Sequence, residues 1–114
     1  IALRAGIVNL KRLTQPHFYS ALNAKTQSLT DGLKAAAQAA AVPFKIHQMG
    51  GLFGLLFTEN EVYNVSDVKN CDIDAYKRFF HQMLKSGIYL APSAYEAGVM
   101  SSAHTDADIN YTLE

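Results

Sequence analysis

The sequence predicts an α+β fold, in which a small and mostly antiparallel sheet carries helices on one face. Three observations predict it. Apolar residues recur at spacings of three and four in three long stretches, which is typical of amphipathic helices. Residues 44–48 show the two-residue alternation of a strand, and a continuous apolar run follows at residues 52–58. Only the Gly50-Gly51 turn separates these two segments, so the strands must run antiparallel.

The first two helices are expected at residues 3–13 and at residues 16 to about 41. Pro16 interrupts the pattern between them and suits the first turn of the second helix, where its missing N–H costs nothing. Pro43 ends that helix, because it disfavours helical geometry at the residue before it. The stripe expected to be buried consists of Phe18, Leu22, Leu29, Leu33, Ala36 and Ala40. The face expected to be exposed carries Asn23, Lys25, Gln27, Thr30 and Lys34.

The apolar run at residues 52–58 is expected to form a strand buried on nearly both faces. Gly54 within it indicates that another part of the backbone approaches closely at that point. Residues 60–70 are polar and are expected to form a loop.

Asp72 is expected to cap a third helix that ends at Gly87, a residue suited to the position just after a helix. A further short strand is expected at residues 88–90. Thr105 with Asp108 resembles a capping box, which predicts that a last helix begins there. The stripe of the third helix expected to be buried consists of Ile73, Tyr76, Phe80, Met83 and Leu84.

Composition limits the classes of function. The 114 residues suffice for one domain, and 49% hydrophobic with 18% charged residues is ordinary for a globular protein. The net charge is zero, so no basic surface is expected that would bind nucleic acid. No apolar run approaches the roughly 20 residues of a membrane span. The single cysteine, Cys71, excludes an internal disulfide and fits a reducing compartment, so we expect a cytoplasmic protein.

Several kinds of chemistry lack support in the residue pattern. The four histidines do not pair with one another or with Cys71 at metal-ligand spacing, so no metal site is expected. Ser93, His104 and Asp106 or Asp108 are residue types of a hydrolase triad, but no Gly-x-Ser-x-Gly motif accompanies them. A Schiff-base lysine needs a desolvated pocket, and none of the lysines stands in an apolar stretch that would provide one. The lysines are Lys11, Lys25, Lys34, Lys45, Lys69, Lys77 and Lys85.

Glu96 is the candidate site residue. It is the only charged side chain in residues 88–103. An isolated carboxylate in an apolar loop either faces solvent or pairs with a cation supplied from elsewhere. The residue pattern leaves both interpretations open.

Two segments together resemble a known family. They are Gly50-Gly51-Leu52-Phe53-Gly54 and Tyr89-Leu90-Ala91-Pro92-Ser93-Ala94-Tyr95-Glu96-Ala97-Gly98. They are similar to the C-terminal small domain of the glutamate-1-semialdehyde 2,1-aminomutases, which belong to the class III aminotransferases that depend on pyridoxal phosphate (PLP). The combination of Glu96-Ala97-Gly98 with Ala103-His104-Thr105 points to the aminomutases, whereas the glycine turn also occurs in related ω-aminotransferases.

The resemblance implies a fold and an activity. The fold would be the C-terminal domain of fold-type I PLP enzymes. The full enzyme would be a homodimer that converts glutamate 1-semialdehyde to 5-aminolevulinate for tetrapyrrole synthesis. The Schiff-base lysine and the PLP contacts would lie in a large domain or in the partner subunit. No catalytic residue would therefore lie in these 114 residues, which alone would be inactive. Glu96 matches the family's active-site glutamate and would help to bind substrate, near an arginine from the N-terminal segment.

The resemblance also implies how the chain is organised. Residues 1–114 would be one small-domain piece of a larger enzyme, with entry helices at residues 1–41 and the sheet with its helices at residues 42–114. Ile1 stands where a start methionine would be, and a helical pattern reaches both ends, as expected of a piece. Such a piece would expose apolar surface, so we expect self-association or marginal stability. The alternatives are the small domain of an ω-aminotransferase and a stand-alone α+β binding module.

Overall fold

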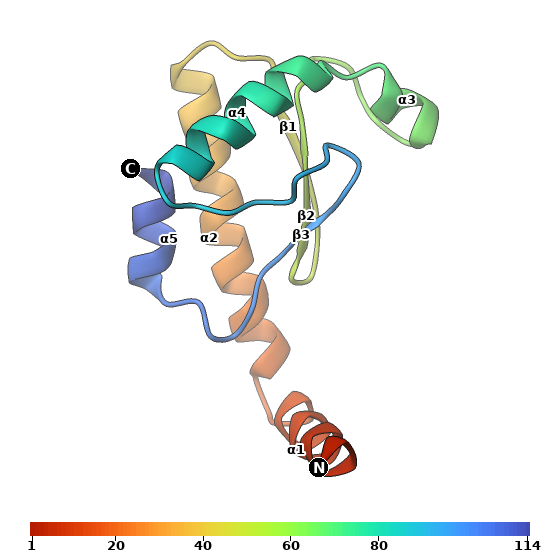
Figure 1. Cartoon of the computed structure of the whole chain (residues 1–114), viewed down its shortest axis with the longest axis vertical. Coiled ribbons are helices and arrows are strands. Elements are labelled where there is room, and N and C mark those ends of the chain that lie inside the picture. The colour runs from red at the N-terminus through yellow and green to blue at the C-terminus, as the bar shows by residue number, and fades with distance from the viewer.

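A computed structural model describes residues 1–114 and confirms the predicted α+β class (Figure 1). The three strands pair in the order β1-β2-β3, and both pairings are antiparallel. No helix is long and apolar enough to cross a membrane. In chain order, the elements are α1 (Ala2–Leu13), α2 (Phe18–Ala39), β1 (Lys45–Met49), β2 (Leu52–Leu56), α3 (Val65–Lys69), α4 (Ile73–Lys85), β3 (Gly98–Val99) and α5 (Asp106–Leu113).

The glycine turn forms the hairpin that the sequence predicts. Met49 pairs with Leu52, so Gly50 and Gly51 are the two loop residues. Gly50 has a φ of 60°, and a positive φ at the first loop residue is the feature of a type II′ turn, whose twist matches that of the strands. Strand β3 adds to the other edge of β2, where Gly98 pairs with Phe53.

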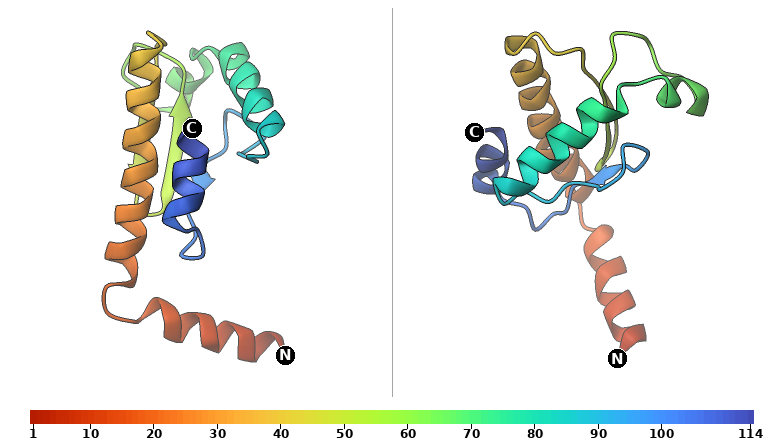
Figure 2. Two further views of the ribbon diagram at one scale, coloured as in Figure 1. Left: turned by 90° about the vertical axis from the view of Figure 1, so that its left-hand side faces the viewer. Right: turned by 45° about the horizontal axis from the view of Figure 1, so that its top comes forward.

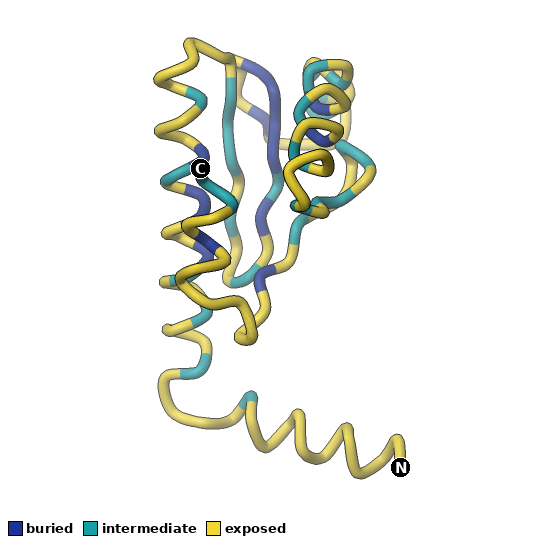
Figure 3. The backbone as a smooth tube through the Cα atoms, turned by 60° about the vertical axis from the view of Figure 1, so that its left-hand side comes forward, coloured by how far each residue is buried: buried dark blue, intermediate teal, exposed yellow.

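The core lies on one face of the sheet. Alternate residues of β2 and its extension, Phe53, Leu55 and Phe57, point into a single buried cluster. Three helices cover that face, and their contributions are Leu29 and Leu33 from α2, Tyr76 and Phe80 from α4, and Ile109 from α5. Figure 3 shows the buried positions gathered along β2 and the facing side of α2. The arrangement confirms the expected layer of helices on one side of a small sheet.

Helix α1 forms where the sequence predicts it but stands apart from the core. It turns away from the rest of the fold (Figure 2), and none of its residues is buried. Leu3 and Leu10 are 82% and 63% exposed. The apolar stripe of α1 therefore has no partner among the described residues.

The predicted boundaries of α2 are corrected at both ends. The helix begins at Phe18, because His17 adopts a left-handed φ of 66° as its N-cap. Pro16 therefore lies in the preceding turn and not in the first helical turn. The helix ends at Ala39, and Ala41 follows with a φ of 53°. The amide of Val42 then donates to the carbonyl of Ala37, which closes the end in a Schellman arrangement.

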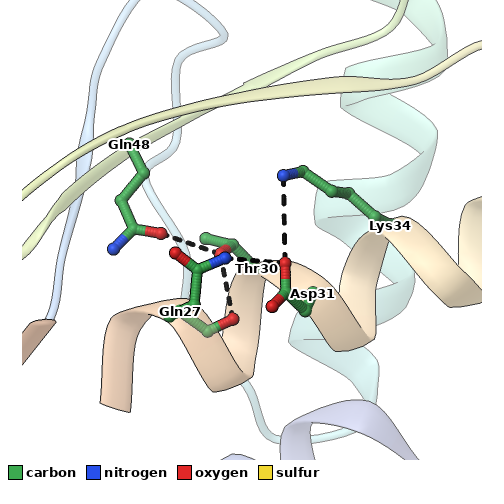
Figure 4. Close-up of polar contacts among 5 residues, drawn as sticks. All are labelled: Gln27, Thr30, Asp31, Lys34 and Gln48. Atoms are coloured by element: carbon green, nitrogen blue, oxygen red, sulfur yellow. Dashed lines mark hydrogen bonds and ion pairs between the residues drawn. The ribbon is translucent and has the colours of Figure 1, made fainter. Parts of the chain in front are cut away.

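Thr30 was predicted to be exposed, and that prediction is wrong. The residue is fully buried, as is Thr26 one turn earlier. The Thr30 hydroxyl donates toward Oε1 of Gln48 in β1, at 2.9 Å, and toward the carbonyl of Gln27, at 3.1 Å (Figure 4). A threonine on the sheet-facing side of α2 is tolerated because a polar side chain from the strand meets it. Two alanines placed on the stripe, Ala36 and Ala40, are exposed.

The close backbone approach predicted at Gly54 occurs elsewhere. A Cβ added at Gly54 would meet nothing within 4 Å. A Cβ added at Gly98 would lie 2.5 Å from Cε2 of Phe53, inside van der Waals distance of that ring. Strand β3 can therefore lie against β2 only because residue 98 has no side chain.

Three further predictions need correction. The loop predicted at residues 60–70 contains the short helix α3, where Asn64 and Asp67 form a reciprocal capping box. Residues 88–90 form no strand, and the third strand is β3 instead. The predicted caps of α4 and α5 are confirmed. The carboxylate of Asp72 accepts from the amide of Ala75 at 2.8 Å. Leu84 was assigned to the buried stripe of α4, and that assignment is wrong because the residue is 44% exposed.

Replacing Thr30 by valine is expected to reduce the free energy of unfolding by about 1–2 kcal/mol, because the side-chain amide oxygen of the half-buried Gln48 loses its hydrogen-bond donor. Thr26→Val is the matched control. The Thr26 hydroxyl donates only to the Leu22 carbonyl of its own helix, so we expect a smaller loss. Urea denaturation of both variants makes the comparison, and equal losses would contradict a role for the contact between α2 and β1.

Gly98→Ala is expected to destabilise the fold by about 1–3 kcal/mol, since the new methyl group overlaps the Phe53 ring. Gly54→Ala should be neutral or stabilising, because its Cβ enters open space and its φ is not positive. Thermal melts followed by circular dichroism separate the two. A loss at residue 54 as large as that at residue 98 would show that the packing is assigned wrongly.

The cap of α5 predicts a pH dependence. The backbone and hydroxyl of Thr105 donate to the Asp108 carboxylate and lower its pKa below the ordinary 3.8. A lowered folded-state pKa adds stability above the unfolded value, and that stability is lost as the pH falls through the folded value. Asp108→Asn should therefore lower the melting temperature at about pH 7, and the difference from the unmodified protein should shrink as the pH falls through the folded-state pKa of Asp108. Asp106→Asn is the control, because Asp106 accepts no hydrogen bond, and an equal loss there would contradict the cap.

Candidate functional site

A cavity of about 360 Å³ lies between β2, the helices α4 and α5, and the segment of residues 88–100. Its walls are mostly apolar and include Leu29, Phe53, Leu55, Tyr76 and Ile109 from the core. The volume is at the lower end of the range of cavities that hold small molecules. The cavity is therefore the candidate site of this domain.

The segment of residues 88–100 is irregular but is tied down at several points. The amide of Ile88 donates to the carbonyl of Met83 at 2.9 Å, which closes the end of α4 around Gly87 with its φ of 83°. The Tyr76 hydroxyl donates to the carbonyl of Ala91 at 2.6 Å. The amide of Met100 donates to the carbonyl of Gly51 at 2.8 Å, beside the hairpin turn. These contacts, together with the pairing of β3 with β2, hold this wall in place although residues 88–90 form no strand.

Glu96 lies at the mouth of the cavity. Its side chain is exposed, lines the opening, and takes part in no hydrogen bond or ion pair. Only its amide is engaged, because it donates to the carbonyl of Ser93 at 3.1 Å and so shapes the loop. Burial raises the pKa of Tyr76, and the negative charge of Glu96 raises it further. The carboxylate is therefore close enough for its charge to reach the phenol in the wall.

The other charged edge of the cavity belongs to α5 and the turn before it. Asp108 lines the cavity, and its Oδ2 accepts from the amide and the hydroxyl of Thr105, both at 2.7 Å. His104 also lines the cavity, and its Nδ1 accepts from the amide of Ser101 at 2.9 Å. Nζ of Lys25 in α2 donates to the carbonyl of Ser102 at 3.3 Å and so holds this turn against α2.

The polar residues considered as a hydrolase triad are only partly brought together. His104 and Asp108 line the cavity, whereas Ser93 and Asp106 do not. The Ser93 hydroxyl instead accepts from the amide of Tyr95 at 3.2 Å within the loop. No group of three His, Cys, Asp or Glu side chains lies close enough together to hold a metal ion.

The cavity does not fit PLP. No lysine or arginine lines it, so there is no cation for the phosphate and no amine for the aldehyde. The charged groups that face it are the carboxylates of Glu96 and Asp108, which repel a phosphate. The residues that line this cavity therefore supply no group for PLP chemistry.

Sequence reasoning found one member of this site and missed the others. Its isolation in an uncharged stretch drew attention to Glu96, and the family resemblance made it a candidate site residue. Tyr76 was predicted only as a core residue, and Asp108 as a helix cap and as one of the residue types of a hydrolase triad. Nothing in their spacing places them around one cavity. They meet because α4 and α5 pack on the same face of the sheet.

Comparison with solved structures places this fold. A β-phenylalanine aminotransferase from Variovorax paradoxus matches with a TM-score of 0.71 and 26% identity, over 82% of this chain and 21% of its own. An ω-transaminase from Sphaerobacter thermophilus matches with a TM-score of 0.72 and 20% identity, over 90% of this chain and 23% of its own. A transaminase with PLP bound matches with a TM-score of 0.67 and 18% identity, over 90% of this chain and 22% of its own.

No family model matches the chain. The chain spans between 21% and 23% of the length of the three transaminases, so it corresponds to one segment of each. All three share the α+β arrangement described above. The chain therefore has the fold of one segment of these transaminases.

Proposed function

We propose that this chain is the small domain of a PLP-dependent enzyme that moves amino groups. The shared fold with three transaminases supports the proposal, and so do the residue blocks around Gly50 and Glu96. The cavity lacks the cations and the lysine that PLP requires, which fits a domain whose cofactor is held by another part of the enzyme. The proposed partners of the chain are a large domain of the same enzyme and, in the homodimer, a second subunit.

Within this class we propose an aminomutase that converts glutamate 1-semialdehyde to 5-aminolevulinate, an isomerisation in tetrapyrrole synthesis. The support is the combination of Glu96-Ala97-Gly98 with Ala103-His104-Thr105. Both blocks border the same cavity, since Glu96 and His104 line it together. A substrate with a carboxylate and an amine suits an enzyme that supplies cations from its large domain and anions from this one.

The observation that carries the role of Glu96 is its free carboxylate. It is exposed and unpaired at the mouth of the cavity, and no cation of this chain lies within ion-pair distance. Such a carboxylate is available to an arginine from another part of the enzyme while the site is empty. When the substrate carboxylate arrives, the arginine exchanges one carboxylate partner for another. Glu96 would therefore help to bind substrate and would not itself react.

A second candidate is an ω-aminotransferase, which takes its amine from an external donor. The observation that favours it is the similarity to an ω-transaminase and to a β-phenylalanine aminotransferase. A stand-alone binding module with no chemistry remains the third candidate.

The test is 5-aminolevulinate formation from glutamate 1-semialdehyde by the longer protein that contains this chain, supplied with PLP. Glu96→Ala should reduce kcat/KM by about tenfold, or about 1.4 kcal/mol, because without Glu96 the arginine is no longer held in position for the incoming substrate carboxylate. Glu59→Ala is the matched control, since Glu59 is an exposed glutamate that lines no part of the cavity. Its activity should equal that of the unmodified protein.

Each other outcome selects a different candidate. Amine exchange with external donors, without 5-aminolevulinate, assigns the protein to the ω-aminotransferases. If no amine chemistry occurs with any donor, the stand-alone binding module is the candidate that remains. Product formation that is insensitive to Glu96→Ala keeps the aminomutase and removes Glu96 from its site.

A further inference from the structure

Two apolar surfaces of this chain have no partner within it. The first is the α1 stripe, formed by Leu3, Ile7 and Leu10, which recur at spacings of four and three and so share one side of the helix. All three side chains are exposed. The turn over residues 14–17, with the left-handed φ of His17, directs α1 away from the body (Figure 2). The stripe can therefore contact a second molecule without any change in the core.

The second surface lies on the face of the sheet opposite the core. Phe53 points into the core, so its neighbours Leu52 and Gly54 point the other way. Met49 and Val99 pair with Leu52 from the two adjacent strands and share its face. Met49, Leu52 and Val99 are 80%, 46% and 65% exposed. These three residues form an apolar row across all three strands, which we call the outer patch.

Gly54 leaves a hollow beside the outer patch. A Cβ added at Gly54 would meet nothing within 4 Å, and the hollow is bordered by His47, Met49, Leu52 and Ala97. A hollow of this kind accepts a side chain that projects from a helix. The lengths also agree, since the α1 stripe rises about 10 Å along its helix and the five residues of β1 extend about 13 Å.

The charges decide how two copies of the chain can meet. Helix α1 carries Arg4, Lys11 and Arg12 and no carboxylate. Two α1 helices packed side by side would therefore bring like charges together, which is unfavourable. The hollow has no lysine, arginine or carboxylate in its lining, and Lys45, further along the same face of β1, is paired with Glu61. An α1 helix on the outer patch meets no unpaired cation.

Both surfaces lie at the same end of the molecule. The hairpin turn packs on the first part of α2, since a Cβ added at Gly51 would lie 3.0 Å from Cδ2 of Leu22. Helix α1 leaves the body at that end (Figure 1). One two-fold axis near this end lets α1 of each copy reach the outer patch of the other. The stripe and the patch expose roughly 700 Å² of apolar surface per copy, close to one partner's share of a standard interface.

We propose that two copies of this chain form a symmetric dimer, in which the α1 stripe of each copy packs on the outer patch of the other. A side chain of the stripe fills the hollow at Gly54. The contact involves no cofactor and no amino-group chemistry. It is therefore independent of the proposed aminotransferase function, and either proposal can fail without the other.

The experiment is sedimentation equilibrium of the 114-residue chain. We expect the mass to rise from 12.5 kDa toward twice that value, with a Kd of about 10 μM, when the concentration is raised from about 2 to about 200 μM. Leu10→Glu and Met49→Lys each place a charge in the contact and should raise the Kd at least about tenfold. Both side chains are exposed in the single chain, so neither change removes a core contact, and circular dichroism checks the fold of each variant.

Two controls are matched to these variants. Val8→Glu puts the same charge on the same helix, but residue 8 lies on the side of α1 away from the stripe. Tyr63→Lys changes an exposed residue that belongs to neither surface. Each should leave the Kd within about twofold of that of the unmodified chain.

A mixture of the Leu10→Glu and Met49→Lys chains tests the reciprocal geometry. Each variant alone has one altered surface in both halves of its dimer, whereas the mixed dimer keeps one half unmodified. Mixing should therefore restore association that neither variant shows alone at about 50 μM.

Three results would overturn the proposal. A chain that stays monomeric up to about 200 μM leaves both surfaces to the large domain of the proposed enzyme. Association that is weakened by Leu10→Glu but not by Met49→Lys assigns the contact to α1 alone. Loss of association with Val8→Glu as large as with Leu10→Glu reduces the effect to net charge.

Discussion

The burial of strand β2 is the constraint on which the rest of the structure depends. Its inward side chains, Phe53 and Leu55, are buried by three helices that are far apart in sequence, and its two edges are paired with β1 and β3. The side chain of Phe53 also restricts which residue can occupy position 98. Its ring occupies the place that a side chain at residue 98 would take, so only a glycine lets β3 pair there. That pairing brings residues 88–100 over the core and puts Glu96 at the mouth of the cavity.

Few of the polar side chains that line the cavity are free to contact a ligand. Its polar atoms either hold the backbone, as Tyr76 and Asp108 do, or remain free, as the Glu96 carboxylate does. A site with carboxylates and no cations is suited to positive groups and unsuited to phosphates. The exposed stripe of α1 is a second surface without a partner in the chain.

Local signals were read correctly where a local interaction decides the structure. Asp72 and Thr105 cap their helices through hydrogen bonds that span three residues, and Gly50 turns the chain within two. Misreadings occurred where the partner is distant in sequence. Thr30 is buried because Gln48 meets it from β1, and Gly54 was assigned a close approach that belongs to Gly98. The segment at residues 88–90 has the composition of a strand but pairs with none of the three strands.

The sequence by itself determined the class of fold, the hairpin, most helix boundaries and the identification of Glu96 as an isolated carboxylate. These follow from periodicity, caps and turn residues, whose energies are set within a few residues of the chain. Only the tertiary structure decided which strand is third, which threonine is buried and which side chains surround the cavity. Those outcomes depend on contacts between α2, β2, α4 and α5, and a contact between distant segments leaves no mark in the spacing of either one.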